Sequence, residues 1–311
     1  MDVKEEPSAR NVILVIGMMR SGTSALTRVL SLCGCTLPEF VLGPQTWNPT
    51  GNWDPIDALA LNTEFLISQD TALGDPTLRL QEISIDREES QRYVGRIQGF
   101  LQTSAPQTSM LLLKDQSITE LMQYWLEAIR LCGYSPKVVI PVRHPGEVFA
   151  SYSASSPRIP PEYVSLVWLK YNLLAERHSR GISRVFVEYK NLIEDWRTEV
   201  ARVASSLGIV LRSDSPSRVD NFLLRDLYHH RGTQLMEAFG DRWCERTYSQ
   251  LSGAANGQAV DTETLDQIYE SFRANERAFR LARGLFRSRS NPDGLREALK
   301  NLHVWKAGRD F

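Results

Sequence analysis

Four short apolar runs constrain the fold of this chain more than any other sequence feature. They cover residues 12–16, 110–113, 138–142 and 185–187 of a 311-residue sequence. Because their apolar residues do not alternate with polar ones, the runs are typical of strands buried on both faces, as in parallel sheets. Pro141 lies inside the third run and cannot donate a ladder hydrogen bond, so it favours an edge or a bulge for that strand.

Apolar residues with helical spacing follow these runs, over Thr23 to Leu32, Ile118 to Leu131, Tyr163 to Ala175 and Leu192 to Leu207. Strands that alternate with helices predict an α/β fold with right-handed crossovers. We therefore expect a P-loop-type parallel sheet flanked by helices.

The C-terminal part differs in composition. Residues 249–260 are rich in Gly, Ser and Ala, which predicts a linker or loop. Beyond it, Leu265, Ile268, Phe272 and Phe279 lie on one helical stripe, which predicts a helical C-terminal extension. The expected organisation is a flexible N-terminus over 1–10, a main domain over 11–248, a linker over 249–260 and an appendage over 261–311. The apolar stripe would dock on the main domain or form a homodimer contact.

Composition excludes several functional classes. The 36 Lys and Arg residues nearly balance 37 Asp and Glu residues, so no overall basic charge attracts nucleic acid. No apolar run approaches the roughly 20 residues of a membrane span, and the polar N-terminus does not fit a secretory signal. The four cysteines fit neither a disulfide framework nor zinc spacing. We expect a cytoplasmic protein without a transmembrane segment or a metal.

A glycine-containing turn follows the first apolar run and precedes a predicted helix. Such a turn presents backbone N–H groups to an oxyanion at the positive end of the helix dipole. Hydroxyl groups and a guanidinium add further donors; the candidate anion-binding residues are Gly17, Arg20, Ser21, Gly22, Thr23 and Ser24. The alternative is an ordinary βα turn built of small residues. The lysine of a nucleoside-triphosphatase loop is missing, which disfavours a metal-dependent triphosphatase.

The sequence Arg20-Ser21-Gly22-Thr23-Ser24 resembles the donor loop of sulfotransferases that use 3′-phosphoadenosine 5′-phosphosulfate (PAPS). It is similar to the arginine form found in bacterial and carbohydrate- or tyrosine-directed members, and the likeness spans roughly residues 11–235. The resemblance implies a sulfotransferase-like fold, PAPS as the co-substrate, and transfer of its sulfuryl group to an acceptor hydroxyl. It also implies that this loop binds the 5′-phosphosulfate and that Arg20 stabilises the leaving group.

The ends of the other predicted strands agree with this resemblance, since ligands of open parallel sheets bind beyond the carboxyl ends of the strands. Arg143 ends the third run and Ser151 follows in the next helix, which resembles the family's 3′-phosphate site. A surface arginine and a plain helix serine are the alternative. Lys114 ends the second run and resembles the residue that contacts the bridging region of the donor. Its alternatives are a solvent-reaching lysine and a partner of Asp115.

Two further likenesses concern the nucleotide. Tyr189 follows the fourth run and resembles an adenine contact, although Lys190 and Asn191 replace the acidic pair of the family's segment. A plain core tyrosine is the alternative. The segment from Phe222 to Gly232, with Arg231, resembles one that closes over the nucleotide.

The acceptor hydroxyl needs a general base, and a carboxylate is the expected one. Asp54 is the candidate because it holds the acidic position of the similar segment Asn48-Pro49-Thr50-Gly51-Asn52-Trp53-Asp54. Asp115 and Glu39 compete for this role. Asp54 is equally suited to capping the helix that begins near Pro55.

Trp47 and Trp53 flank the same segment and favour a carbohydrate or glycolipid acceptor, because tryptophans stack on sugar rings. The alternative is that they pack in the core, which is the more common role of a tryptophan. A phenol, a tyrosyl side chain and a secondary metabolite stay open. Two other functional classes remain: a magnesium-dependent nucleotide kinase or phosphatase, and a nucleotide-binding module without catalysis.

Overall fold

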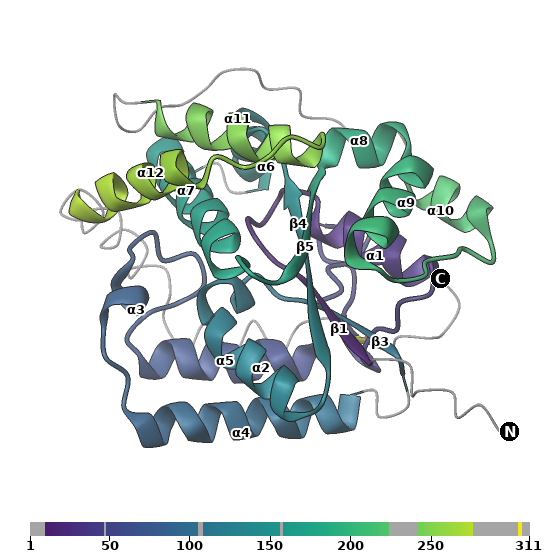
Figure 1. Cartoon of the computed structure of the whole chain (residues 1–311), viewed down its shortest axis with the longest axis horizontal. Coiled ribbons are helices and arrows are strands. Elements are labelled where there is room, and N and C mark those ends of the chain that lie inside the picture. The colour runs from purple at the N-terminus through teal and green to yellow at the C-terminus, as the bar shows by residue number, and fades with distance from the viewer. Residues whose placement is uncertain are drawn as a thin grey trace, which may run out of the picture.

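The structure is a computed structural model that describes residues 10–46, 48–104, 108–155, 158–223 and 242–275, together with the backbone of 304–306. The main sheet is parallel and has the strand order β3-β1-β4-β5 (Figure 1). Its strands are β1 (Asn11–Val15), β3 (Met110–Lys114), β4 (Ser135–Val142) and β5 (Ser183–Glu188). All four match the apolar runs, so the predicted α/β fold with a parallel sheet is confirmed.

Pro141 does not lie at an edge, because β4 runs between β1 and β5. The N–H of Ile16 donates to the carbonyl of Val139, so that residue of β4 faces β1. In a parallel ladder every second residue faces the same neighbour, and Pro141 therefore faces β1 as well. The last paired residue of β1 is Val15, opposite Val139. The missing donor of Pro141 thus falls beyond the end of β1 and costs no ladder bond.

Helices cover both faces of the sheet (Figure 1). They are α1 (Thr23–Leu32), α2 (Ile56–Ser68), α3 (Arg79–Glu82), α4 (Arg87–Ser104), α5 (Ile118–Leu131), α6 (Pro145–Ser155), α7 (Pro161–His178), α8 (Tyr189–Glu194), α9 (Trp196–Leu207), α10 (Pro216–Phe222), α11 (Trp243–Ala255) and α12 (Thr262–Ala274). One apolar core joins the sheet to α1, α8, α9 and α10, and a larger one joins its other face to α2, α4, α5, α6, α7, α11 and α12. Successive strand residues enter opposite cores, which explains why the runs are continuously apolar.

Two predicted helices, Thr23–Leu32 and Ile118–Leu131, have the predicted bounds. The helix predicted over 192–207 is divided into α8 and α9 at Asp195. Asp195 has φ −150° and its carboxylate accepts a hydrogen bond from the N–H of Thr198, so it caps α9. The cap starts a new helix where the apolar spacing alone predicts one continuous helix.

The predicted linker over 249–260 is wrong for residues 249–255, which belong to α11. Leu251 and Ala255 are buried in the larger core, and that burial offsets the low helix propensity of the small polar residues around them. The stripe residues Leu265, Ile268 and Phe272 of α12 enter the same core. Phe279 and the N-terminal residues 1–9 lie outside the described residues.

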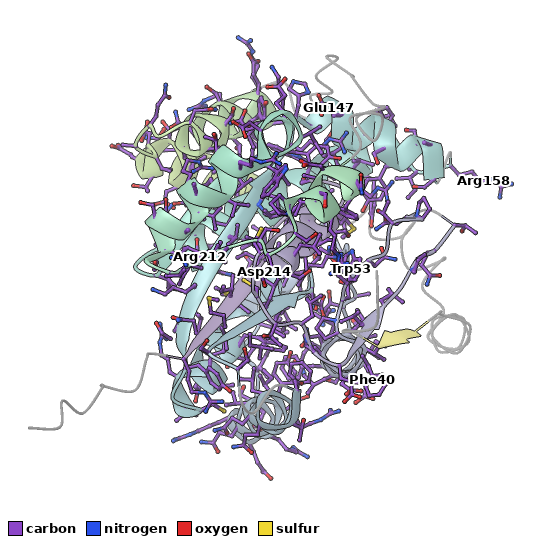
Figure 2. All side chains as sticks on the ribbon, turned by 90° about the vertical axis from the view of Figure 1, so that its right-hand side faces the viewer. Phe40, Trp53, Glu147, Arg158, Arg212 and Asp214 are labelled. Atoms are coloured by element: carbon purple, nitrogen blue, oxygen red, sulfur yellow. The ribbon has the colours of Figure 1, made fainter. Side chains whose placement is uncertain are left out.

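A second, antiparallel pair joins β2 (Phe40–Leu42) to β6 (Val304–Lys306), seen beside Phe40 in Figure 2. None of the helices in the described ranges is long and apolar enough to cross a membrane.

Candidate functional site

A cavity of about 670 Å³ opens at the carboxyl ends of the parallel strands. Many of its residues belong to the turn after β1, the ends of the other strands and the segment before α2. Its lining comprises Met19, Arg20, Gly22, Thr23, Ser24, Ala25, Leu42, Asn48, Pro49, Thr50, Asn52, Asp54, Leu59, Leu73, Lys114, Gln116, Arg143, Ser151, Tyr152, Ser155, Tyr189 and Phe222. The structure thus brings most of the sequence-predicted site residues to one place.

The turn after β1 needs left-handed backbone at three positions: Gly17 (φ 109°), Arg20 (φ 66°) and Gly22 (φ 90°). A Cβ on Gly22 would lie 2.2 Å from Cδ2 of Tyr189, so only glycine fits there. This approach sets the start of α1 against the ring that follows β5.

Two residues of the predicted turn do not line the cavity. The N–H of Gly17 donates to Oγ1 of Thr119 at 2.9 Å, so it is already engaged within the protein. Ser21 is buried, and its hydroxyl has no hydrogen-bond partner among the described residues. Arg20, Gly22, Thr23 and Ser24 are the candidate anion-binding residues of the turn that line the cavity.

Two guanidinium groups share one end of the cavity. Nε of Arg20 donates to Oγ of Ser151 at 3.0 Å, and Nη1 of Arg143 donates to the carbonyl of Arg20 at 3.1 Å. Nε of Arg143 pairs with Glu147 at 2.9 Å, and its guanidinium lies 4.6 Å from the ring centroid of Tyr189. Burial, more than the neighbouring Arg143, lowers the pKa of Arg20. Crowded, partly desolvated cations of this kind favour a ligand with several negative charges.

A buried ion pair lies in the same cavity. Nζ of Lys114 donates to Oδ2 of Asp54 at 2.7 Å and to the carbonyl of Asn52 at 3.1 Å, and both charged residues are at most 5% exposed. Burial raises the pKa of Asp54 to about 6, because desolvation outweighs the attraction of Lys114. The alternative role of Asp54 as a helix cap is wrong, since the N-cap of α2 is Pro55 and no side chain caps it.

The two competing carboxylates lie outside the cavity. Asp115 is fully buried and accepts hydrogen bonds from Nδ2 of Asn62 and from both the N–H and the hydroxyl of Ser117. It therefore stabilises the turn that leads into α5. Glu39 is exposed. Asp54 is the carboxylate that the structure brings to Lys114 and to the cavity.

Of the two roles that the sequence allows for Trp53, the structure shows the core role and not stacking on a ligand. Trp53 is 2% exposed and is not among the lining residues. Its ring instead lies against Gly51 and under the guanidinium of Arg28, 4.7 Å from the ring centroid. Trp47 and Arg231 lie outside the described residues.

Sequence reasoning missed Gln116 and Glu147. Nε2 of Gln116 donates to Oγ1 of Thr23 at 3.2 Å and places an amide in the cavity. Its position two residues after the end of β3 could have identified it. Glu147 lies four residues after Arg143 in the predicted helix, a spacing that allows the observed ion pair.

No group of three His, Cys, Asp or Glu side chains in the described ranges is arranged to hold a metal ion. The charged side chains of the cavity lining are those of Arg20, Arg143, Lys114 and Asp54. Three cations and one carboxylate, with a helix N-terminus, fit a multiply charged anion such as a nucleotide bisphosphate.

No family model and no curated protein matches the chain. Among solved structures, it is similar to a sulfotransferase domain from the curacin biosynthetic pathway (14% identity, 79% of this chain and 99% of that chain, TM-score 0.44). It is also similar to a sulfotransferase domain of the Synechococcus PCC 7002 olefin synthase (18% identity, 86% of this chain and 97% of that chain, TM-score 0.43). A third similar structure is a mouse sulfotransferase complexed with PAP, adenosine 3′,5′-bisphosphate (12% identity, 90% of this chain and 89% of that chain, TM-score 0.36). At these identities and TM-scores the similarities do not assign a function. The function of the chain has to be inferred from the residues of the cavity.

Proposed function

We propose that this chain is a sulfotransferase that moves the sulfuryl group of PAPS to an acceptor hydroxyl without a metal. One observation carries the proposal: Arg20, Arg143 and Lys114 meet in a single cavity at the start of α1, with one buried carboxylate beside Lys114. The resemblance of Arg20–Ser24 to the family's donor loop supports the same donor.

The two guanidinium groups fit the two phosphates of the donor. Arg143 and Ser151 are proposed to bind the 3′-phosphate, and the backbone of Gly22 to Ser24 at the α1 N-terminus to bind the 5′-phosphosulfate. The Arg20 side chain donates a hydrogen bond to Ser151, and the Arg20 carbonyl accepts one from Arg143. These bonds support a short separation between the 3′-phosphate and 5′-phosphosulfate subsites. Tyr189 lines the cavity beside Arg143 and is the proposed adenine contact.

Sulfuryl transfer asks the protein for alignment and for charge stabilisation. The acceptor oxygen forms a bond to sulfur while the bond between sulfur and the bridging oxygen breaks, and the electron pair stays on the 5′-phosphate. Arg20 and Lys114 stabilise that charge. The hydroxyl proton passes to Asp54, whose pKa of about 6 leaves it ionised at neutral pH and able to accept a proton.

The acceptor is proposed to carry an apolar group near its hydroxyl. Leu42, Leu59 and Leu73 line the cavity, and no tryptophan whose side chain the structure describes is among its lining residues. The amide groups of Asn48 and Asn52 donate to other protein atoms, so they are engaged within the fold. A glycolipid stays compatible with this lining, whereas a bare carbohydrate loses the support that Trp53 gave it.

Calorimetric titration tests the donor. We expect adenosine 3′,5′-bisphosphate (PAP) to bind and ATP with magnesium to bind more weakly, and the reverse order would favour a nucleotide kinase or phosphatase. Incubation with PAPS and a panel of alcohols, phenols and sugars, followed by mass spectrometry for added sulfate, tests the transfer. Tight PAP binding without transfer to any acceptor would favour the binding module without catalysis.

A further inference from the structure

The residue before Asp54 has an unusual backbone conformation. Trp53 has φ +67°, in the left-handed region that bulky residues rarely occupy. Such a conformation persists only where the surrounding structure holds it, and it often marks a functional site. Trp53, labelled in Figure 2, is also buried, so its indole is part of what holds the backbone there.

The indole of Trp53 is held from two sides. A Cβ on Gly51 would lie 3.0 Å from Cε2 of the indole, so the ring packs directly on the glycine backbone. The guanidinium of Arg28 lies on the ring at 4.7 Å from its centroid. Arg28 belongs to α1, the helix whose N-terminus lies at the cavity, and it is 8% exposed. Contact with an indole face stabilises a desolvated guanidinium.

Hydrogen bonds carry this restraint to Asp54. The N–H of Trp53 donates to the carbonyl of Leu42 at 2.9 Å, and the N–H of Leu42 donates to the carbonyl of Asp54 at 2.7 Å. The left-handed backbone of Trp53 sets the direction of the chain that enters Asp54, and the packed indole holds that backbone in place. If the indole loses its packing, the Trp53 backbone can relax from φ +67° and turn Asp54 with it. The carboxylate would then leave its position 2.7 Å from Lys114.

Resting on the proposed function, we propose that Trp53 is a positioning residue. The Arg28 guanidinium holds its indole against Gly51, and this contact fixes the Asp54 carboxylate beside Lys114. The donor and the proton acceptor are thereby connected, since Arg28 lies on the helix that begins at the donor loop. Trp53 touches neither substrate; it acts through Asp54.

The chain offers a matched control for the Arg28–Trp53 contact. The guanidinium of Arg197 lies 4.5 Å from the ring centroid of Trp196, at the start of α9 and outside the cavity. Arg28→Met and Arg197→Met therefore both remove an arginine–indole contact, and Arg197→Met also removes an exposed ion pair with Asp220. We expect Arg28→Met to lower kcat about 10-fold or more, as small misplacements of reacting groups do, with KM for PAPS unchanged. Arg197→Met should keep the kcat of the unmodified protein. Arg28→Lys keeps a cation near the indole, so its kcat should lie between those of Arg28→Met and the unmodified protein.

A second pair of variants decides the matter if Arg28→Met does not fold. Trp53→Phe keeps an aromatic face for Arg28, and Trp53→Leu does not, so we expect kcat to fall further in Trp53→Leu while both variants bind PAP. Equal kcat values for this pair, or equal values for Arg28→Met and Arg197→Met, would overturn the inference. Failure of the unmodified protein to transfer sulfate from PAPS would instead refute the proposed function.

Discussion

Replacing Lys114 by Met tests the electrostatics of the cavity most sharply. The substitution keeps an apolar stem of similar length but removes the ammonium 2.7 Å from the Asp54 carboxylate. Both partners are buried, so solvent cannot replace the lost charge. Breaking a buried pair from one side costs about 3–5 kcal/mol, and we expect that destabilisation at about pH 8.

The pH dependence of this loss follows from the pKa of Asp54. Burial raises that pKa from 3.8 to about 6 with Lys114 present, so above about pH 7 Asp54 is ionised in both folded and unfolded protein. Without Lys114 the folded pKa rises further, and the folded state keeps a proton that the unfolded state has lost. Stability of the variant then falls as pH rises, by about 1.4 kcal/mol per pH unit until the new pKa is passed.

Urea unfolding at several pH values between about 6.5 and 8 measures the effect. We expect the free energy of unfolding of Lys114→Met to fall with pH relative to the unmodified protein. The double variant Lys114→Met/Asp54→Asn has no carboxyl to titrate and serves as the control, with a pH dependence like that of the unmodified protein. A single variant whose stability runs parallel to the unmodified protein would refute the reasoning.

Three further predictions concern nucleotide binding and turnover. Gly22→Ala should lower the free energy of unfolding by about 2–5 kcal/mol and abolish PAP binding, because the new Cβ would lie 2.2 Å from the Tyr189 ring. Gly181→Ala is the control: its φ is +74° but its Cβ would enter open space, so it should lower the free energy of unfolding by only about 1–2 kcal/mol. Equal losses of stability in thermal unfolding would contradict this reasoning. Arg143→Ala should weaken PAP binding about 10- to 100-fold in calorimetry and leave AMP binding unchanged, and equal effects on both nucleotides would argue against a 3′-phosphate contact. Sulfuryl transfer should slow as pH falls through about 6 and Asp54 gains a proton. Asp54→Asn should lower kcat about 10²- to 10⁴-fold and remove this limb of the pH profile; full activity would mean that Asp54 is not the base.

The sheet could be predicted from the sequence because burial on both faces leaves an unmistakable pattern. Residues 12–16 and 110–113 are apolar at every position, because successive residues of each strand enter opposite cores. The helix over Thr23–Leu32 was equally clear, since Gly22 marks its start. Only the prediction that Pro141 places its strand at an edge is wrong. The proline is tolerated inside the sheet because β1 ends before it, and the sequence of β4 does not show where β1 ends.

The approach of Arg20, Arg143 and Ser151 was predictable from one rule: the carboxyl ends of neighbouring parallel strands share an edge. The rule says nothing about which way a side chain outside the sheet turns. Trp53 precedes Asp54 in sequence, yet its left-handed backbone turns the indole under Arg28 and away from the cavity. No periodic pattern in the sequence around Trp53 indicated its left-handed backbone or the direction of its indole.

The C-terminal part shows the opposite limit. Composition over 249–260 is typical of a loop, and local propensity gave no reason to expect α11 there. The helix owes its place to the burial of Leu251 and Ala255 against the sheet's core. Tertiary burial of this kind overrides propensity and is visible only once the partners are known.

A crystal structure of the protein with adenosine 3′,5′-bisphosphate tests the central claim most directly. We predict the 3′-phosphate within hydrogen-bonding distance of Arg143 and Ser151, and the 5′-phosphate at the backbone N–H groups that begin α1. The Lys114 ammonium should face the 5′-phosphate. A nucleotide bound outside this cavity, or one whose phosphates contact neither Arg143 nor the start of α1, would contradict the account.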